Sequence, residues 1–173
     1  ILIPKCESAN DINKVNEEIN HISKHASDQV FLMPIIESSL GVINAHSIAS
    51  AADNVVALAI GLEDLTADLG VNRTSEGKES IYARNVIVNA ATASGIQAID
   101  SVYSDVSDME GLKSTVSNSK ALGFVGMGCI HPRQVKIINE GFNPGKKEIN
   151  KAKEIVRAFE KAKQVEQERG KIT

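Results

Sequence analysis

Two acidic positions follow short apolar stretches of the chain, and together they suit metal-assisted chemistry. Residues 31–36 are almost entirely hydrophobic and precede Glu37, and residues 55–62 precede Glu63 and Asp64. Short apolar runs rich in β-branched residues are typical of strands in a buried parallel sheet. If the two strands are neighbours, Glu37 and Asp64 lie at the same edge of the sheet, where two close carboxylates repel unless a cation lies between them or one of them stays protonated. Mg²⁺ suits such a pair, because it takes hard oxygen ligands and is often held by one or two carboxylates.

The elements that would position these acids alternate between strand and helix. Residues 63–78 are expected to form a long loop with at most one helical turn, and loops of this length are usually functional. Repeated strand–helix units predict a parallel α/β sheet. The residues alone leave two architectures open, an open doubly wound sheet and part of a (β/α)8 barrel. Strands are expected at 1–5, 31–36, 55–60, 96–102 and 124–130, and helices at 11–24, 40–51, 79–94, 107–122, 131–138 and 148–167.

Composition excludes several classes of function. The chain has 173 residues, 3% aromatic residues, no Trp and a net charge of −3, which disfavours binding to nucleic acid or to an anionic membrane. No apolar run reaches the length of a transmembrane helix. The two cysteines, Cys6 and Cys129, are too few for a disulfide framework and fit a reducing cytoplasm. Both are expected to be small buried hydrophobic residues.

Five short motifs follow one another along the chain, and their order and spacing carry a resemblance. Together they resemble the HpcH/HpaI aldolase and citrate lyase beta-subunit family, and the likeness runs from Ile1 to about Ala162. Any one motif would be weak evidence, whereas five in register are specific. The motifs are PKCES at 4–8, IIE at 35–37, GLEDLTADLG at 61–70, AIDSVY at 98–103, and GFVG at 123–126 with IHPRQ at 130–134.

The resemblance implies a (β/α)8 TIM barrel of which this chain carries only strands four to eight. Residues 1–142 would form the C-terminal part of the barrel domain, and residues 143–173 a helix that leads to a lid segment beyond the chain. The resemblance also implies that a substrate-binding Arg and an acid/base Asp of the lid lie outside this sequence. We therefore expect the chain to be a piece of a longer protein, with little or no turnover by itself.

The activity that the resemblance implies is Mg²⁺-dependent carbon–carbon cleavage or formation of the aldol or Claisen type. The substrate would be a 3-hydroxy acyl-CoA such as citryl-CoA, malyl-CoA or citramalyl-CoA, which gives acetyl-CoA and an α-keto acid. Coenzyme A would enter as part of the substrate. The family is commonly trimeric or hexameric, so we expect a cytoplasmic homo-oligomer, with other citrate lyase subunits as further partners. Two alternatives are a CoA-independent class II pyruvate aldolase and a non-catalytic fragment or subunit that keeps a metal-binding half-site.

The resemblance also assigns roles to particular residues. Glu37 and Asp64 match the metal ligands of the family, and their separation of 27 residues is that of one strand–helix unit. Glu63, Asp64 and Leu65 lie where relatives bind the keto-acid carboxylate through main-chain N–H groups, which suits an anion at the start of a helix. Lys5 and His131 are candidates for contact with the substrate.

Other positions are expected to be structural, or depart from the family pattern. Asp68 is expected to cap a helical turn, and Asp100 is expected to be a structural residue. Relatives often have Arg where this chain has Leu40, and many have Lys where it has Met127. Either missing charge could have served a CoA phosphate or a substrate carboxylate.

Overall fold

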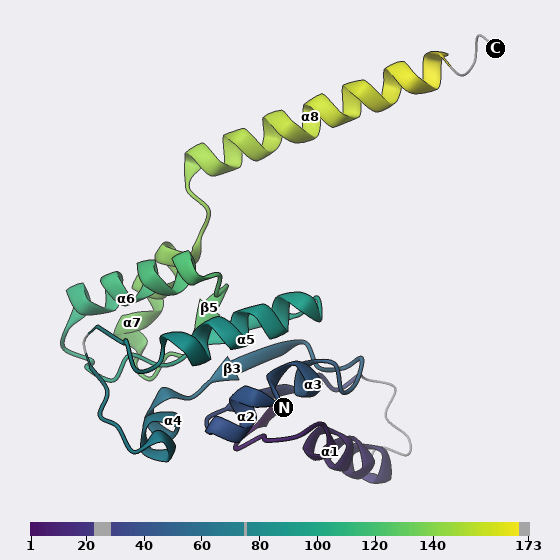
Figure 1. The fold of residues 1–173 in the computed structure, drawn as a ribbon. Coiled ribbons are helices and arrows are strands. Elements are labelled where there is room, and N and C mark those ends of the chain that lie inside the picture. The colour runs from purple at the N-terminus through teal and green to yellow at the C-terminus, as the bar shows by residue number, and fades with distance from the viewer. Residues whose placement is uncertain (23–28, 75, 170–173) are drawn as a thin grey trace. The chain divides into compact units, whose positions relative to one another are not determined.

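The computed structural model describes residues 1–22, 29–74 and 76–169, the last six of these by their backbone alone. The chain forms two compact units, Ile1–Phe142 and Asn143–Thr173, and each is described by itself. The first unit contains the sheet and most of the helices (Figure 1). The second contains one long helix.

The first unit is built on a parallel sheet with the strand order β1-β2-β3-β4-β5. Every neighbouring pair is parallel, and Ile36 at the end of β2 lies opposite Ile60 at the end of β3. The prediction of a parallel α/β fold is therefore confirmed. The strands are shorter than predicted, most of all the last one, which among the described residues pairs with a neighbour on one side only. They are β1 (Leu2–Ile3), β2 (Met33–Ile36), β3 (Ala57–Ile60), β4 (Gln97–Asp100) and β5 (Gly126–Met127).

Helices follow the strands in the expected alternation, but one of the predicted helices is interrupted. The single helix predicted over 40–51 is two short helices that meet at Asn44. The Asn44 side chain donates a hydrogen bond to the carbonyl of Glu7 at 2.8 Å, and such side-chain competition favours the end of a helix. The helices of this unit are α1 (Ala9–Ile22), α2 (Ser39–Ile43), α3 (Ala45–Ala49), α4 (Leu62–Leu69), α5 (Ile81–Ala93), α6 (Met109–Leu122) and α7 (Pro132–Phe142).

The prediction of a long loop over 63–78 is wrong in its first half, which is helix α4 (Figure 1). Two acids stand in the first turn of α4, where they face the positive end of the helix dipole. Leu62, Leu65 and Thr66 form its buried face. Gly70 ends the helix in the left-handed conformation (φ 71°), which glycine adopts without strain. The loop that remains is shorter and leads into α5.

The main core lies around the central strand β3, whose four residues are all buried. A parallel strand covered on both faces is expected to be apolar throughout, as this one is. Ile12, Ile48 and Ile87 pack from the surrounding helices into the same cluster. A second, smaller cluster contains Leu112, Val116, Met127 and Ile138. The core fixes the strands and leaves their carboxyl ends to carry polar groups.

The second unit consists of α8 (Lys146–Arg169), a charged helix of 24 residues. It is two residues longer at each end than the predicted range of 148–167. Apolar side chains at Ile149, Ile155, Val156 and Phe159 are at least partly exposed within this unit. Among the helices that the structure describes, none is long and apolar enough to cross a membrane.

Candidate functional site

The carboxylates of Glu37 and Asp64 lie at the same edge of the sheet. Glu37 follows β2 directly, and Asp64 stands in the first turn of α4, four residues after the end of β3. Because β2 and β3 are paired neighbours that end level, both acids reach one cavity of about 300 Å³, here called the rim cavity. Its lining consists of the acids Glu7, Glu37, Asp64 and Asp68, with Lys5, Ser38 and Ala67.

Lys5 contacts both of these carboxylates. Its main-chain N–H donates to Oε1 of Glu37 at 2.7 Å, and its Nζ lies 3.5 Å from Oδ2 of Asp64. The φ angle of Lys5 is 49°, in the left-handed region that costs a non-glycine residue ~1 kcal/mol or more. Such conformations persist where surrounding contacts hold them, often at functional sites. The ion pair itself adds little stability, because the two side chains are 76% and 53% exposed.

Gly61 lies directly against Glu37, a contact that the sequence analysis did not single out. A Cβ at Gly61 would stand 2.7 Å from Oε2 and 3.0 Å from Cβ of Glu37. The N–H of Gly61 also donates to the carbonyl of Ile36 at 2.9 Å. The bare main chain at this position therefore leaves the space that the Glu37 side chain occupies.

We predict that Gly61→Ala moves the Glu37 carboxylate and weakens binding of a divalent cation at the rim cavity by about tenfold, since binding sites tolerate only small displacements. Calorimetric titration with Mg²⁺ measures the change. Gly126→Ala is the matched control, because a Cβ there would meet its nearest neighbour, Ile99, at an ordinary 3.5 Å. Equal affinity in the two variants would contradict the role of Gly61.

The first turn of α4 presents two main-chain N–H groups without a partner in the described part of the chain, those of Glu63 and Asp64. The N–H of Leu62 donates to Oγ of Ser101 at 3.1 Å. The N–H of Leu65 donates to the carbonyl of Gly61 at 3.1 Å, and the Leu65 side chain is buried. The donors open to an anion at this helix start are therefore those of Glu63 and Asp64, whereas that of Leu65 is engaged.

The side chain of Glu63 connects α4 to two other segments. Its Oε1 accepts hydrogen bonds from Oγ of Ser104 at 2.7 Å and from Nη1 of Arg73 at 2.6 Å. These bonds, that of Ser104 with the larger effect, hold the pKa of Glu63 below its ordinary value. The contact is therefore present at neutral pH and is lost only as the pH falls through that lowered pKa. Neither Ser104 nor Arg73 was a candidate from sequence, because no motif marks their contacts with Glu63 across 41 and 10 residues.

His131 lies away from these groups, at the start of α7. Its Nδ1 accepts from the N–H of Arg133 at 3.2 Å, and its carbonyl accepts from the N–H of Gln134 at 2.9 Å. It follows β5, at the opposite edge of the sheet from β1 and Lys5. This unit therefore brings Lys5, Glu37 and Asp64 together, with His131 apart from them.

Asp68 and Asp100 have structural partners, as expected. Oδ2 of Asp68 accepts from the N–H of Ser39 at 2.7 Å and from its Oγ at 2.6 Å, so Asp68 caps the start of α2 rather than a turn of its own helix. The same bonds lower the pKa of Asp68. Asp100 is buried beside Arg84 and Ser119.

The two cysteines differ in their surroundings. Cys6 is buried, and burial, aided by the charges of Asp11 and Glu7, raises its pKa to about 11, so it stays a thiol at neutral pH. Cys129 is exposed, and the prediction that it is buried is wrong. The ladder of β5 ends at Met127, so Cys129 lies beyond the packed part of the strand.

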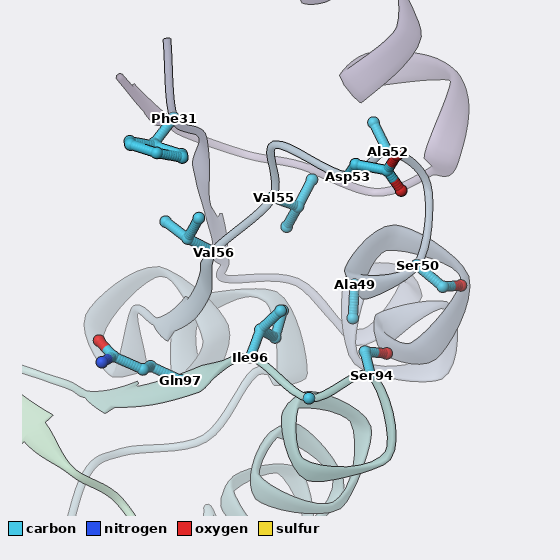
Figure 2. A pocket seen from close by; sticks show the side chains of 11 residues that line it. Phe31, Ala49, Ser50, Ala52, Asp53, Val55, Val56, Ser94, Ile96 and Gln97 are labelled. Atoms are coloured by element: carbon cyan, nitrogen blue, oxygen red, sulfur yellow. The ribbon is translucent and has the colours of Figure 1, made fainter. Parts of the chain in front are cut away.

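A separate cavity of about 810 Å³ lies at the opposite end of the strands (Figure 2). Phe31 and Val56 precede β2 and β3, and Gln97 is the first residue of β4; the side chains of all three border this cavity. Among the residues that the structure describes, Asp53 is the one titratable residue in its lining. Because the carboxylate pair lies at the other end of the sheet, this cavity is not the candidate site.

A family model for HpcH/HpaI aldolase/citrate lyase matches residues 1–132. The chain belongs to this family. Among curated members, it is 40% identical over 167 residues to citrate lyase subunit beta of Leuconostoc mesenteroides subsp. cremoris, covering 95% of this chain and 55% of that protein. It is 34% identical over 182 residues to L-malyl-CoA/beta-methylmalyl-CoA lyase of Rhodobacter capsulatus, with 94% and 57% covered. The chain thus spans about half the length of the curated relatives that it matches.

Solved structures of related proteins share the fold. RipC from Yersinia pestis matches with a TM-score of 0.78 at 34% identity, over 86% of this chain and 65% of that chain. The citrate lyase beta subunit of M. tuberculosis, complexed with oxaloacetate and magnesium, matches with a TM-score of 0.69 at 30% identity, over 83% and 60%. A structure from Mycobacterium tuberculosis with magnesium, acetoacetate and coenzyme A matches with a TM-score of 0.72 at 29% identity, over 91% and 56%.

The rim cavity of this family member suits a hard cation. Among the residues with described side chains, no three acids, histidines or cysteines are grouped as a complete metal site. Glu37 and Asp64 are nevertheless two of the four acids that line the cavity, and the Lys5 ammonium beside Asp64 shows that a positive charge is accommodated there. Mg²⁺ often takes one or two carboxylates and completes its shell with water and substrate, so this donor set fits it.

Proposed function

We propose that the chain carries a metal-binding half-site of a Mg²⁺-dependent carbon–carbon lyase, with Glu37 and Asp64 as the protein ligands. The observation that carries the proposal is that these two carboxylates, one directly after β2 and one in the first turn of the helix that follows β3, share one cavity with Lys5. Solved structures of relatives in complex with magnesium and oxaloacetate, or with magnesium, acetoacetate and coenzyme A, support it. When bound, Mg²⁺ supplies Lewis-acid polarisation of a keto-acid oxygen.

The residues of this chain would bind and orient the keto acid. The N–H groups of Glu63 and Asp64 would hold its carboxylate, since main-chain donors at a helix start favour an anion. The Lys5 ammonium would leave Asp64 and contact the substrate. His131 is a further candidate for substrate contact, which would require the longer protein to bring it close to the rim cavity. The substrate-binding Arg and the acid/base Asp implied by the resemblance would come from outside this sequence.

The architecture we propose is strands four to eight of a (β/α)8 barrel. In support, β1 and β5 each have a free edge among the described residues, and free edges of a buried parallel sheet need cover. That cover would come from three further strands of a longer protein. The assembled protein would be a homo-oligomer in a reducing, cytoplasmic compartment, alone or with other citrate lyase subunits.

The substrate we propose is a 3-hydroxy acyl-CoA that yields acetyl-CoA and an α-keto acid. Names of the relatives support it, because citrate lyase, malyl-CoA lyase and citramalyl-CoA lyase are among them. A second candidate is a non-catalytic subunit that keeps the half-site, favoured by the absence of a group of three metal-ligating side chains among the described residues. Measuring acyl-CoA cleavage by the 173-residue chain separates the two, and little or no turnover is expected from the chain alone.

Calorimetric titration with Mg²⁺, with and without saturating oxaloacetate, tests the proposed function. Because the keto acid would complete the metal's shell, its presence should tighten Mg²⁺ binding by about tenfold or more. Glyoxylate should act similarly, and acetate should not. If Mg²⁺ does not bind under either condition, the proposal of a half-site in this chain is rejected.

Lys5→Met separates two roles of this lysine. The ammonium competes with a metal for Asp64, so its removal should tighten Mg²⁺ binding by up to about fivefold, the scale of an exposed ion pair. If Lys5 also contacts the substrate, the further gain from oxaloacetate should shrink in the same variant. The two titrations above measure both effects. An unchanged oxaloacetate gain would remove Lys5 from the substrate contacts.

A further inference from the structure

The first N–H group of helix α4 is capped by a residue that follows another strand, and not by a side chain at the helix's own N-cap position. Its N-cap position is Gly61, which has no side chain to accept a hydrogen bond. The acceptor is instead Oγ of Ser101, directly after β4, which takes the N–H of Leu62 at 3.1 Å. Both residues are buried. The helix that carries Asp64 is thus held at its first residue by a contact across 39 positions of sequence.

Ser101 is itself held by a buried polar network. Oδ1 of Asp100 accepts from the N–H of Ser101 at 2.9 Å, and Oδ2 of Asp100 accepts from Oγ of Ser119 at 2.5 Å. Arg84 pairs with the Asp100 carboxylate and donates to Oγ of Ser119 at 3.1 Å. All four residues are 9% exposed or less. A satisfied polar network in the interior is rigid, because each group would lose its partner if it moved.

We propose that Ser101 is a positioning residue of the rim cavity. An isolated helix of eight residues is unstable in water, so the direction in which α4 starts depends on its caps and packing. The Ser101 hydroxyl fixes the amide of Leu62 and thereby aims the next two amides, those of Glu63 and Asp64, and the Asp64 carboxylate. Arg84, Asp100 and Ser119 hold Ser101 in place through their buried network and so keep this contact fixed. This inference rests on the proposed function of the rim cavity.

The test compares Ser101→Ala with Ser101→Thr, which keeps the hydroxyl. Loss of an N-terminal cap acceptor is worth about fivefold in an equilibrium constant. Ser101→Ala should therefore bind Mg²⁺ in the presence of oxaloacetate about fivefold more weakly, whereas Ser101→Thr should stay within about twofold of the parent chain. Ser50→Ala is the matched control, because Ser50 Oγ donates to a helix carbonyl of α3, away from the rim cavity. It should leave binding unchanged.

A second readout distinguishes positioning from general loss of stability. The amide ¹⁵N and ¹H resonances of Leu62, Glu63 and Asp64 should shift in Ser101→Ala, at a temperature where the variant is fully folded. If Ser101→Ala does not fold, Ser101→Cys, of similar size but a weak acceptor, replaces it. Parent-like affinity with unchanged resonances would overturn the proposal. If the parent chain binds no Mg²⁺, the proposed function fails, and the three resonances still decide whether Ser101 positions α4.

Discussion

Asp64→Asn is expected to abolish Mg²⁺ binding by this chain, with a loss of affinity of about 100-fold or more. The substitution removes one of two negative charges at the proposed half-site and leaves a weaker neutral oxygen. Changes to residues that merely support metal ligands already cost about 10–100-fold, so loss of a ligand should reach the upper end of that range or exceed it. Calorimetric titration with Mg²⁺ and oxaloacetate gives the affinity.

The fold of Asp64→Asn should remain intact, because the Asp64 side chain is half exposed and its ion pair with Lys5 is weak. Asp68→Asn is the matched control, since Asp68 lines the same cavity but its carboxylate caps α2. We expect this control to bind Mg²⁺ within a few-fold of the parent chain. The reverse order, with Asp68 essential and Asp64 dispensable, would show that the wrong acid has been assigned.

Arg84→Met is expected to lower the free energy of unfolding by about 3–5 kcal/mol, the typical cost of leaving one member of a buried ion pair without its partner. Arg84 and Asp100 have side chains that are 11% and 2% exposed, so water cannot compensate for the lost guanidinium. Arg84 also lies over the ring of Phe124, 5.5 Å from its centroid. Urea unfolding followed by circular dichroism measures the change.

Two further variants show whether the isolated charge causes this loss. Arg84→Met combined with Asp100→Leu removes both charges and should recover a large part of the stability, as replacement of a whole buried pair often does. Lys113→Met breaks an exposed pair with Glu110 and should cost less than about 1 kcal/mol. If Arg84→Met lowered the free energy of unfolding no more than Lys113→Met does, the buried network would not stabilise the fold as we expect.

The sheet and its order could be predicted because each strand is a local signal. The runs before Glu37 and Asp64 are apolar on both faces, and the alternation of strand and helix predicts parallel neighbours. The same reasoning placed Glu37 and Asp64 at one edge. The family resemblance added the metal, which two carboxylates alone only suggest.

What could not be predicted depends on distant contacts or on competing local preferences. Helix α4 was missed because its N-cap residue, Gly61, has no side chain to accept a hydrogen bond, and the acceptor that it uses, Ser101, lies 39 residues away. The break at Asn44 arises from its bond to the carbonyl of Glu7, 37 residues earlier. The approach of Gly61 to Glu37 is likewise invisible in the sequence, because nothing in the spacing shows which glycine faces which side chain.

The measurement that tests the central claim most directly is the anomalous diffraction of Mn²⁺ bound to crystals of this chain with oxaloacetate. Mn²⁺ stands in for Mg²⁺ because both prefer carboxylate, carbonyl and water oxygens. The account predicts a peak within coordination distance of one oxygen each from Glu37 and Asp64, with the Lys5 ammonium displaced from Asp64. A fully ordered rim cavity with no peak between these carboxylates, or with Lys5 still paired to Asp64, would contradict the claim.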